Sequence, residues 1–349
     1  MRHVFTLAGV MLLAGSAASA QPGDANTVGK PFPPGAFFIS TGPNPFAGPF
    51  EAVADCKFFS SDIDRKVKGC GDLIADAAGE PRADVVYVKV EARRDPKNLA
   101  AAHYHRGLAL RQKHEVAKAV ADLDEAIRLD PQMSQAFDLR GQIRLDAGDL
   151  DLAISDFGAA LRIDPNYAQA HHHRGAAYSQ KSQYDLAIAD FGDAIRLDPK
   201  LTNAYFNRGE IFRRAKQLDR ALDDLTQVNR LDPKHVFGLV ARGQVYSAMG
   251  RDDEAIADFS EAIRLAPEYP PAYKGRAVSR YGKGELESAI ADASEAIRLN
   301  PKLVETWVIR AIVREKSGSR DQAIADYKKA LELDPTNALA QQGVRRLGG

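Results

Sequence analysis

Seven prolines recur at one fixed interval along residues 100–337. Each stands 34 residues after the one before it. Self-similarity at a fixed period of this size indicates a stack of like structural units, each burying its apolar face against its neighbours. This period constrains the fold more than any single motif does. The prolines are Pro131, Pro165, Pro199, Pro233, Pro267, Pro301 and Pro335.

Each unit reads as two helices joined by short turns. The seventh residue is always Arg, the eighth is Gly or Ala, the twentieth is Ala and the twenty-third is Asp. Ala153, Ile154, Phe157 and Leu161 fall on one helical stripe in the second half of a unit. The small eighth and twentieth residues let two helix axes approach closely. The second helix ends at each proline, because a residue before Pro avoids the α region. The units are 100–133, 134–167, 168–201, 202–235, 236–269, 270–303 and 304–337.

This pattern resembles the tetratricopeptide repeat (TPR) family. The small-residue pair, the second-helix aromatic and the terminal Pro match the family's signature. The resemblance covers all seven units and implies an all-α fold, a right-handed α-solenoid of helix-turn-helix repeats. It departs at the first-helix aromatic, which is His103, His171 or Leu239 in three units. The second-helix aromatic residues are Phe157, Phe191, Phe259 and Tyr327.

The first twenty residues have the pattern of a secretory signal peptide. A basic start at Arg2 precedes the apolar run Val4–Leu13 and small residues that end at Ala20. The run is too short for a permanent membrane span, and no later stretch approaches about 18 apolar residues. We expect a chain secreted across the inner membrane, periplasmic and without a lipid anchor, because Ser16 replaces the Cys of a lipobox. The alternative is an apolar N-terminal helix of the mature fold.

Two segments separate this leader from the repeats. Residues 21–49 are rich in Pro and Gly, which disfavours helices and inner strands, so we interpret them as a linker. Residues 50–99 read as a degenerate helical module, in which 50–74 resemble a repeat. Residues 83–94 suit either a strand or a helix, and Asp95-Pro96 favours a helix ahead of Ala100. We predict a disulfide bond between Cys56 and Cys70, on facing helices in an oxidising compartment. A redox or metal pair is the alternative. At the other end, residues 338–349 read as a C-terminal capping helix.

The Arg and Asp positions form two ladders along the chain. In TPR folds the twenty-seventh residue faces the next unit, and the Asp lies one turn before it. We therefore predict structural ion pairs between successive units. The alternatives are pairing within one unit, such as Arg106–Asp122, and a basic stripe that binds anions. The predicted pairs are Asp122–Arg140, Asp156–Arg174, Asp190–Arg208, Asp224–Arg242, Asp258–Arg276 and Asp292–Arg310.

The family resemblance also implies a concave groove lined by first helices. Its second, fifth, ninth and twelfth positions mix aromatic side chains with both charge signs, which suits an extended peptide or a partner's helix. The groove lacks the Lys and Asn set with which chaperone-binding relatives hold a carboxylate. The candidate groove residues are Tyr104, Arg111, Asp138, Gln142, His172, Phe206, Glu210, Arg213, Val240, Gln244, Lys274, Tyr281 and Glu315.

The sequence offers no candidate for catalysis. It has no nucleophile elbow, zinc-protease motif, phosphate loop or dinucleotide fingerprint. The adjacent His171, His172 and His173 point about 100° apart on a helix, so they cannot chelate one metal, and we expect neither metal nor cofactor. With 47 basic and 47 acidic residues, the chain has no overall attraction for nucleic acid.

We therefore predict a non-enzymatic scaffold or adaptor of the bacterial cell envelope. It would hold a protein or peptide partner in the groove, bind no nucleic acid, and be a monomer or weak oligomer. The first alternative is a structural module that self-associates. The second is an enzyme with a site near Pro31–Arg94.

Overall fold

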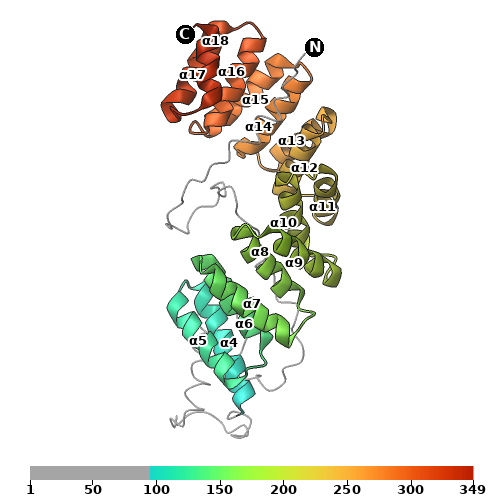
Figure 1. Cartoon of the computed structure of the whole chain (residues 1–349), viewed down its shortest axis with the longest axis vertical. Coiled ribbons are helices and arrows are strands. Elements are labelled where there is room, and N and C mark those ends of the chain that lie inside the picture. Colours follow the sequence, from blue (N-terminus) through green and yellow to red (C-terminus); the bar gives the residue numbers. More distant parts are fainter. Residues whose placement is uncertain (1–94, 349) are drawn as a thin grey trace. The chain divides into compact units, whose positions relative to one another are not determined.

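The computed structural model describes residues 95–348, and its regular structure there consists of fifteen helices (Figure 1). None of these residues forms a strand, so the all-α prediction is confirmed for this part of the chain. The helices are α4 (Pro96–Gln112), α5 (Val116–Leu129), α6 (Ser134–Ala147), α7 (Leu150–Ile163), α8 (Ala168–Gln180), α9 (Tyr184–Leu197), α10 (Thr202–Arg214), α11 (Leu218–Leu231), α12 (Val236–Ala248), α13 (Asp252–Leu265), α14 (Pro270–Gly282), α15 (Leu286–Leu299), α16 (Val304–Lys316), α17 (Arg320–Leu333) and α18 (Ala338–Leu347).

The described chain divides into an N-terminal unit, residues 95–204, and a C-terminal unit, residues 205–348. Helices α4–α9 form the N-terminal unit, and α10 after its first turn, with α11–α18, forms the other. Within each unit, consecutive helices pack against one another in the order of the chain. The first helices of successive repeats also touch, as α4 touches α6 and α12 touches α14. The first helices therefore share one face of each unit, which we call the inner face.

The ends of the repeats follow from local chemistry. Asp164 precedes Pro165 and has extended backbone angles, φ −129° and ψ 93°, as steric contact with the proline ring requires. Its side chain then accepts a hydrogen bond of 3.0 Å from the amide of Asn166, which closes an Asx turn. Aspartate or asparagine makes the same turn after α5, α9, α11, α15 and α17.

In four of the seven repeats, the core between the paired helices is closed by a large ring against a small residue. Phe157 of α7 is fully buried, and a Cβ placed on Gly141 of α6 would lie 2.7 Å from its ring. That separation is far below van der Waals contact, so the ring and a residue larger than Gly cannot both occupy the site. This is the close approach that the small eighth residue predicts.

Both ends of the described chain are marked by capped helices. Helix α4 begins at Pro96, four residues before the first repeat, with Asp95 capping the amide of Lys97 at 3.0 Å. The Asp-Pro pair that ends other repeats thus begins a helix here, because Pro fits the first helical position. Helix α18 spans the segment for which we predict a cap. Its Leu339, Val344 and Leu347 pack on the core of the last repeat.

Several expectations fall on residues 1–94 and 349, which lie outside the described part of the chain. These are the signal peptide, the linker, most of the degenerate module and the Cys56–Cys70 disulfide. Among the helices of residues 95–348, none combines the length and the apolar character that crossing a membrane requires.

Candidate functional site

Every repeat contains one Arg–Asp ion pair between its own two helices. Arg140 of α6 donates from Nε and Nη2 to the two carboxylate oxygens of Asp156 on α7, at 3.0 and 2.7 Å. The predicted pairing between successive units is therefore wrong, and the alternative within one unit is correct. The turn between the helices sets the two side chains opposite each other, sixteen residues apart. The pairs are Arg106–Asp122, Arg140–Asp156, Arg174–Asp190, Arg208–Asp224, Arg242–Asp258, Arg276–Asp292 and Arg310–Asp326.

Three of these arginines also reach the preceding repeat, but at a different residue. Nη1 of Arg140 donates to Asp124 at 2.5 Å, and Nη1 of Arg276 donates to Ser260 at 3.0 Å. Both acceptors are the twenty-fifth residue of the repeat before. A buried, bidentate pair of this kind adds little net stability, because the cost of desolvating the two charges offsets their attraction. It fixes how the helices meet, because removing one partner leaves the other charge buried and unpaired. The ladder is thus structural.

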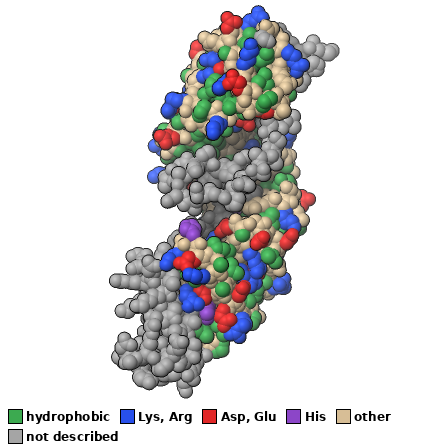
Figure 2. All heavy atoms as spheres, turned by 90° about the vertical axis from the view of Figure 1, so that its left-hand side faces the viewer, with side chains coloured by type: hydrophobic (Ala, Val, Ile, Leu, Met, Phe, Trp, Pro, Cys, Tyr) green, Lys and Arg blue, Asp and Glu red, His purple; other side chains and the backbone are tan. Residues whose placement is uncertain are grey.

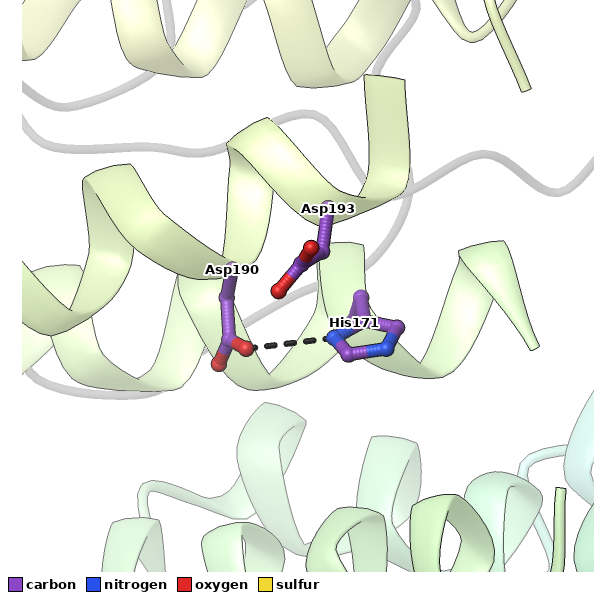
Figure 3. A group of neighbouring side chains, drawn as sticks. All are labelled: His171, Asp190 and Asp193. Atoms are coloured by element: carbon purple, nitrogen blue, oxygen red, sulfur yellow. Dashed lines mark hydrogen bonds and ion pairs between the residues drawn. The ribbon is translucent and has the colours of Figure 1, made fainter. Parts of the chain in front are cut away.

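His171 extends one of these pairs into a cluster that has metal-ligand chemistry (Figure 3). Its Nδ1 is hydrogen-bonded to Asp190 at 3.2 Å, and Asp193 completes a group whose ligand atoms lie within 4.8 Å of one another. The hydrogen bond to Asp190 is the main cause that raises the pKa of His171. Arg174 already occupies both oxygens of Asp190 at 2.7 Å, so a metal ion would have to displace a guanidinium. The geometry therefore favours an internal ion pair.

His172 does not lie on an accessible surface. It is 1% exposed, and its ring packs against the rings of Phe191 and His173, with centroids 5.6 and 5.4 Å away. Burial, with a smaller contribution from His173, lowers the pKa of His172 to about 3. Its neighbour His173 contacts Asp138 of the preceding repeat at 2.8 Å. The histidine run is therefore mostly interior structure.

The buried neutral His172 should make folding sensitive to acid. Its pKa is lower in the folded than in the unfolded chain, where it is about 6.5, so protonation favours unfolding. The stability that the neutral His172 side chain provides is complete above about pH 6.5 and is lost as the pH falls toward about 3. Between pH 6.5 and 5 we expect it to lower the free energy of unfolding by about 2 kcal/mol.

Urea denaturation at several pH values, followed by far-UV circular dichroism, measures this loss. His172→Leu should flatten the acid limb, whereas His114→Asn, at an exposed position, should leave it unchanged. His114 has φ 60°, which Asn tolerates. An acid limb that is the same in the native chain and in His172→Leu would contradict the assignment.

Three predicted groove residues of the N-terminal unit, Arg111, Asp138 and Gln142, form one hydrogen-bond network on the inner face. Arg111 of α4 donates to Gln142 of α6 at 2.7 Å and to Asp146 at 2.9 Å. Gln142 in turn donates to Asp138 at 2.8 Å. Tyr104 of α4 is partly exposed and lies close enough to Asp138 for the charge of that carboxylate to act on its hydroxyl. The structure thus brings these four predicted residues together.

The predicted groove residues of the C-terminal unit fall into two classes. Phe206 and Val240 are buried, and Arg213 pairs with Glu210 through two bonds of 2.8 and 2.9 Å. These side chains form part of the packing. Three others are partly exposed on first helices, and Glu315 is held by Arg346 at 2.6 and 2.7 Å. The three partly exposed residues are Gln244, Lys274 and Tyr281.

Sequence reasoning missed a row of residues at the last position of the repeats. Tyr167, His235 and Tyr269 lie at the turn that leads into the next first helix and are partly exposed. The ring of Phe237 lies 6.3 Å from that of His235 and 5.4 Å from that of Tyr269. The sequence contained a signal for these residues, because the thirty-fourth residue is aromatic or His in three of the seven repeats.

Charge is mixed on the part of the surface that Figure 2 shows. On the face shown in Figure 2, acidic and basic side chains alternate without a broad area of one sign. Many of them pair along one helix, as Glu295 does with Arg298 and Glu261 with Arg264. These exposed pairs contribute little to stability.

Comparisons with known proteins agree with this architecture. Models described as TPR repeat match residues 141–182 and 177–215, and models described as tetratricopeptide repeat match 100–133, 202–235, 240–304 and 304–337. No curated protein sequence matches the chain.

Solved structures are similar in fold. A tetratricopeptide repeat protein from Parabacteroides merdae has 18% identity and a TM-score of 0.52, over 72% of this chain and 99% of that one. PilF of Pseudomonas aeruginosa has 20% identity and a TM-score of 0.54, over 61% and 97%. The Cut9–Hcn1 hetero-tetramer of APC/C has 16% identity and a TM-score of 0.57, over 82% of this chain and 55% of the other. With the family models matching most of residues 100–337, the chain belongs to the tetratricopeptide repeat family.

Proposed function

We propose that this protein is a non-catalytic scaffold that holds a peptide or protein partner on the inner face of its first helices. The observation that supports the proposal most is that two polar side chains, Gln244 on α12 and Lys274 on α14, have no partner within the described chain. Both side chains are partly exposed, and neither has a hydrogen bond or an ion pair with any residue in 95–348. The repeated Arg and Asp side chains, by contrast, satisfy one another. Polar groups that the fold does not use are available to a partner.

The leader-like first twenty residues support a location outside the inner membrane. We propose export to the periplasm and a role as an adaptor in the cell envelope, without cofactor or metal. Fractionation of cells that express the full chain tests this location. Recovery of the chain with the cytoplasm, at its unprocessed length, would contradict it.

A charge reversal on the inner face tests the binding proposal. Peptides selected by the full chain from a random library should bind Lys274→Glu at least ten times more weakly than the native protein, as measured by fluorescence anisotropy. The reason is that the substitution places a carboxylate where the partner meets an ammonium group.

Lys328→Glu is the matched control, because it makes the same change at an exposed position of α17. We expect it to alter the dissociation constant less than twofold. Equal effects of the two variants, or a selection that yields no binding peptide, would refute the proposed function.

Self-association is the second candidate, and exposed apolar side chains favour it. Val116, Leu152, Tyr184 and Leu186 on the second helices α5, α7 and α9 are 42–52% exposed. Apolar groups gathered on one surface are typical of an interface. Light scattering across a range of concentrations separates the candidates, since a strict monomer removes the second.

A further inference from the structure

One buried carboxylate on the inner face pairs with a histidine, whereas each of the other buried aspartates pairs with an arginine. Eight aspartates are buried in residues 95–348, and seven of them form the Arg–Asp pairs of the repeats. The eighth is Asp138 of α6, which is 2% exposed. Within this part of the chain, no Lys or Arg pairs with it. A buried charge without a cation is costly, so its presence on a binding face requires an explanation.

The partners that Asp138 does have are hydrogen-bond donors without a permanent charge. His173 contacts Oδ1 at 2.8 Å, and Gln142 donates to Oδ2 at 2.8 Å. The hydroxyl of Tyr167 donates to the same oxygen over a long 3.4 Å. A carboxylate accepts about four hydrogen bonds, so one place remains and a second is weakly held.

The charge around Asp138 has an acidic excess. The only cation in its network, Arg111, reaches it through the amide of Gln142 and also pairs with Asp146 at 2.9 Å. Two carboxylates therefore share one guanidinium, and the negative charge of Asp138 has no permanent cation of its own. A cation from outside the chain would balance it.

Two tyrosines stand beside this carboxylate. Tyr104 and Tyr167 are partly exposed, and the negative charge of Asp138 acts on both. Burial and that charge raise the pKa of Tyr104 to about 12, and they also raise the pKa of Tyr167. Both rings are thus neutral phenols at physiological pH. The faces of aromatic rings next to a carboxylate attract ammonium and guanidinium groups.

We propose that the inner face of the N-terminal unit binds a lysine or arginine side chain of the partner, between Tyr104 and Tyr167 and against Asp138. This inference rests on the proposed function and specifies its ligand. The incoming cation replaces the long Tyr167 hydrogen bond and neutralises the Asp138 carboxylate. Binding should therefore depend on a basic residue at one position of the peptide.

A double-mutant cycle with selected peptides tests this subsite. Peptides chosen by the full chain from a random library of twelve-residue sequences, roughly the length that an inner face of several helices accommodates, should be enriched in Lys or Arg at one position. Replacing that residue by norleucine should weaken binding to the native protein at least tenfold. In Asp138→Asn the same replacement should change the dissociation constant less than twofold, because the carboxylate that distinguishes the two peptides is gone.

Two further variants distinguish loss of the subsite from loss of folding. Tyr104→Leu retains apolar bulk on α4 but removes the ring, and it should lower the preference for the basic peptide at least threefold. Asp253→Asn, the same chemical change at an exposed carboxylate of α13, should leave the preference intact. Circular dichroism confirms that each variant is folded.

The outcomes separate the two proposals. Peptides that bind without any basic preference, or an Asp138→Asn variant that weakens the basic and the norleucine peptides equally, overturn the subsite but leave the proposed function. The second result would mean that His173 serves as the internal counter-ion. A selection that yields no peptide refutes the proposed function itself.

Discussion

Replacing Asp326 with alanine is expected to lower the free energy of unfolding by about 3–5 kcal/mol. Its carboxylate is buried and accepts bonds from Arg310 at 2.9 and 2.8 Å and from Arg314 at 2.7 Å. The two guanidiniums, whose side chains are only 13% and 18% exposed, would remain without their anion. The single tryptophan of the chain, Trp307, lies 5.0 Å from the guanidinium of Arg310, so urea denaturation followed by its fluorescence measures the loss.

Glu332→Ala provides the control on the same helix. Glu332 pairs with Lys329 but is 63% exposed, so we expect a change below about 0.5 kcal/mol. Replacing Asp326, Arg310 and Arg314 together with Leu and two Met should be less harmful than Asp326→Ala alone, because no charge is then left buried. Similar losses from Asp326→Ala and Glu332→Ala would show that the pair is solvated.

Replacing Phe259 with alanine is expected to cost about 3–5 kcal/mol through the cavity it leaves. The ring is fully buried between Gly243 of its own repeat and Gly275 of the next. A Cβ on Gly275 would lie 2.4 Å from the ring, so Gly275→Ala should cost about 1–3 kcal/mol in the native protein. In the Phe259→Ala background the same change should be close to neutral, because the methyl group enters vacated space.

Gly158→Ala is the control for a glycine in a helix. The nearest atom to its added Cβ would be Nη1 of Arg162 at 3.6 Å, so there is no steric conflict. We expect a gain of about 0.5–1 kcal/mol from the lower flexibility of the unfolded chain. Thermal unfolding followed by circular dichroism compares all four variants. If Gly275→Ala lowers the free energy of unfolding equally in the native and the Phe259→Ala backgrounds, the packing of the Phe259 ring between the two repeats is refuted.

The helix pairs and their boundaries were predictable because their causes are local. The Asp-Pro pair acts on its own backbone, and the small eighth residue meets a side chain sixteen residues later in the same repeat. Asp164 has the extended angles that its proline imposes, and Gly141 faces the ring that the spacing places opposite it. At Asp95-Pro96 the pair stands at the start of helix α4, since Pro also fits the first helical position.

The partners in the ion-pair ladder were not predictable, because the sequence permits two arrangements of nearly equal spacing. Asp122 is 16 residues from Arg106 and 18 residues from Arg140. The packing of the two helices of one repeat decides which guanidinium meets the carboxylate. The structure places Arg106 there, at 2.7 and 2.5 Å.

Periodicity in the sequence was sufficient to predict the repeat and the all-α class. It also predicted the face on which polar first-helix residues gather, because periodicity along a chain defines which positions share a helix face. Tertiary structure decided what each of those positions became. His172 and Phe206 are buried while Lys274 is partly exposed, although all three are fifth residues of their repeats. Exposure depends on the volumes of neighbours in adjacent repeats, and a position's place in the period does not specify those volumes.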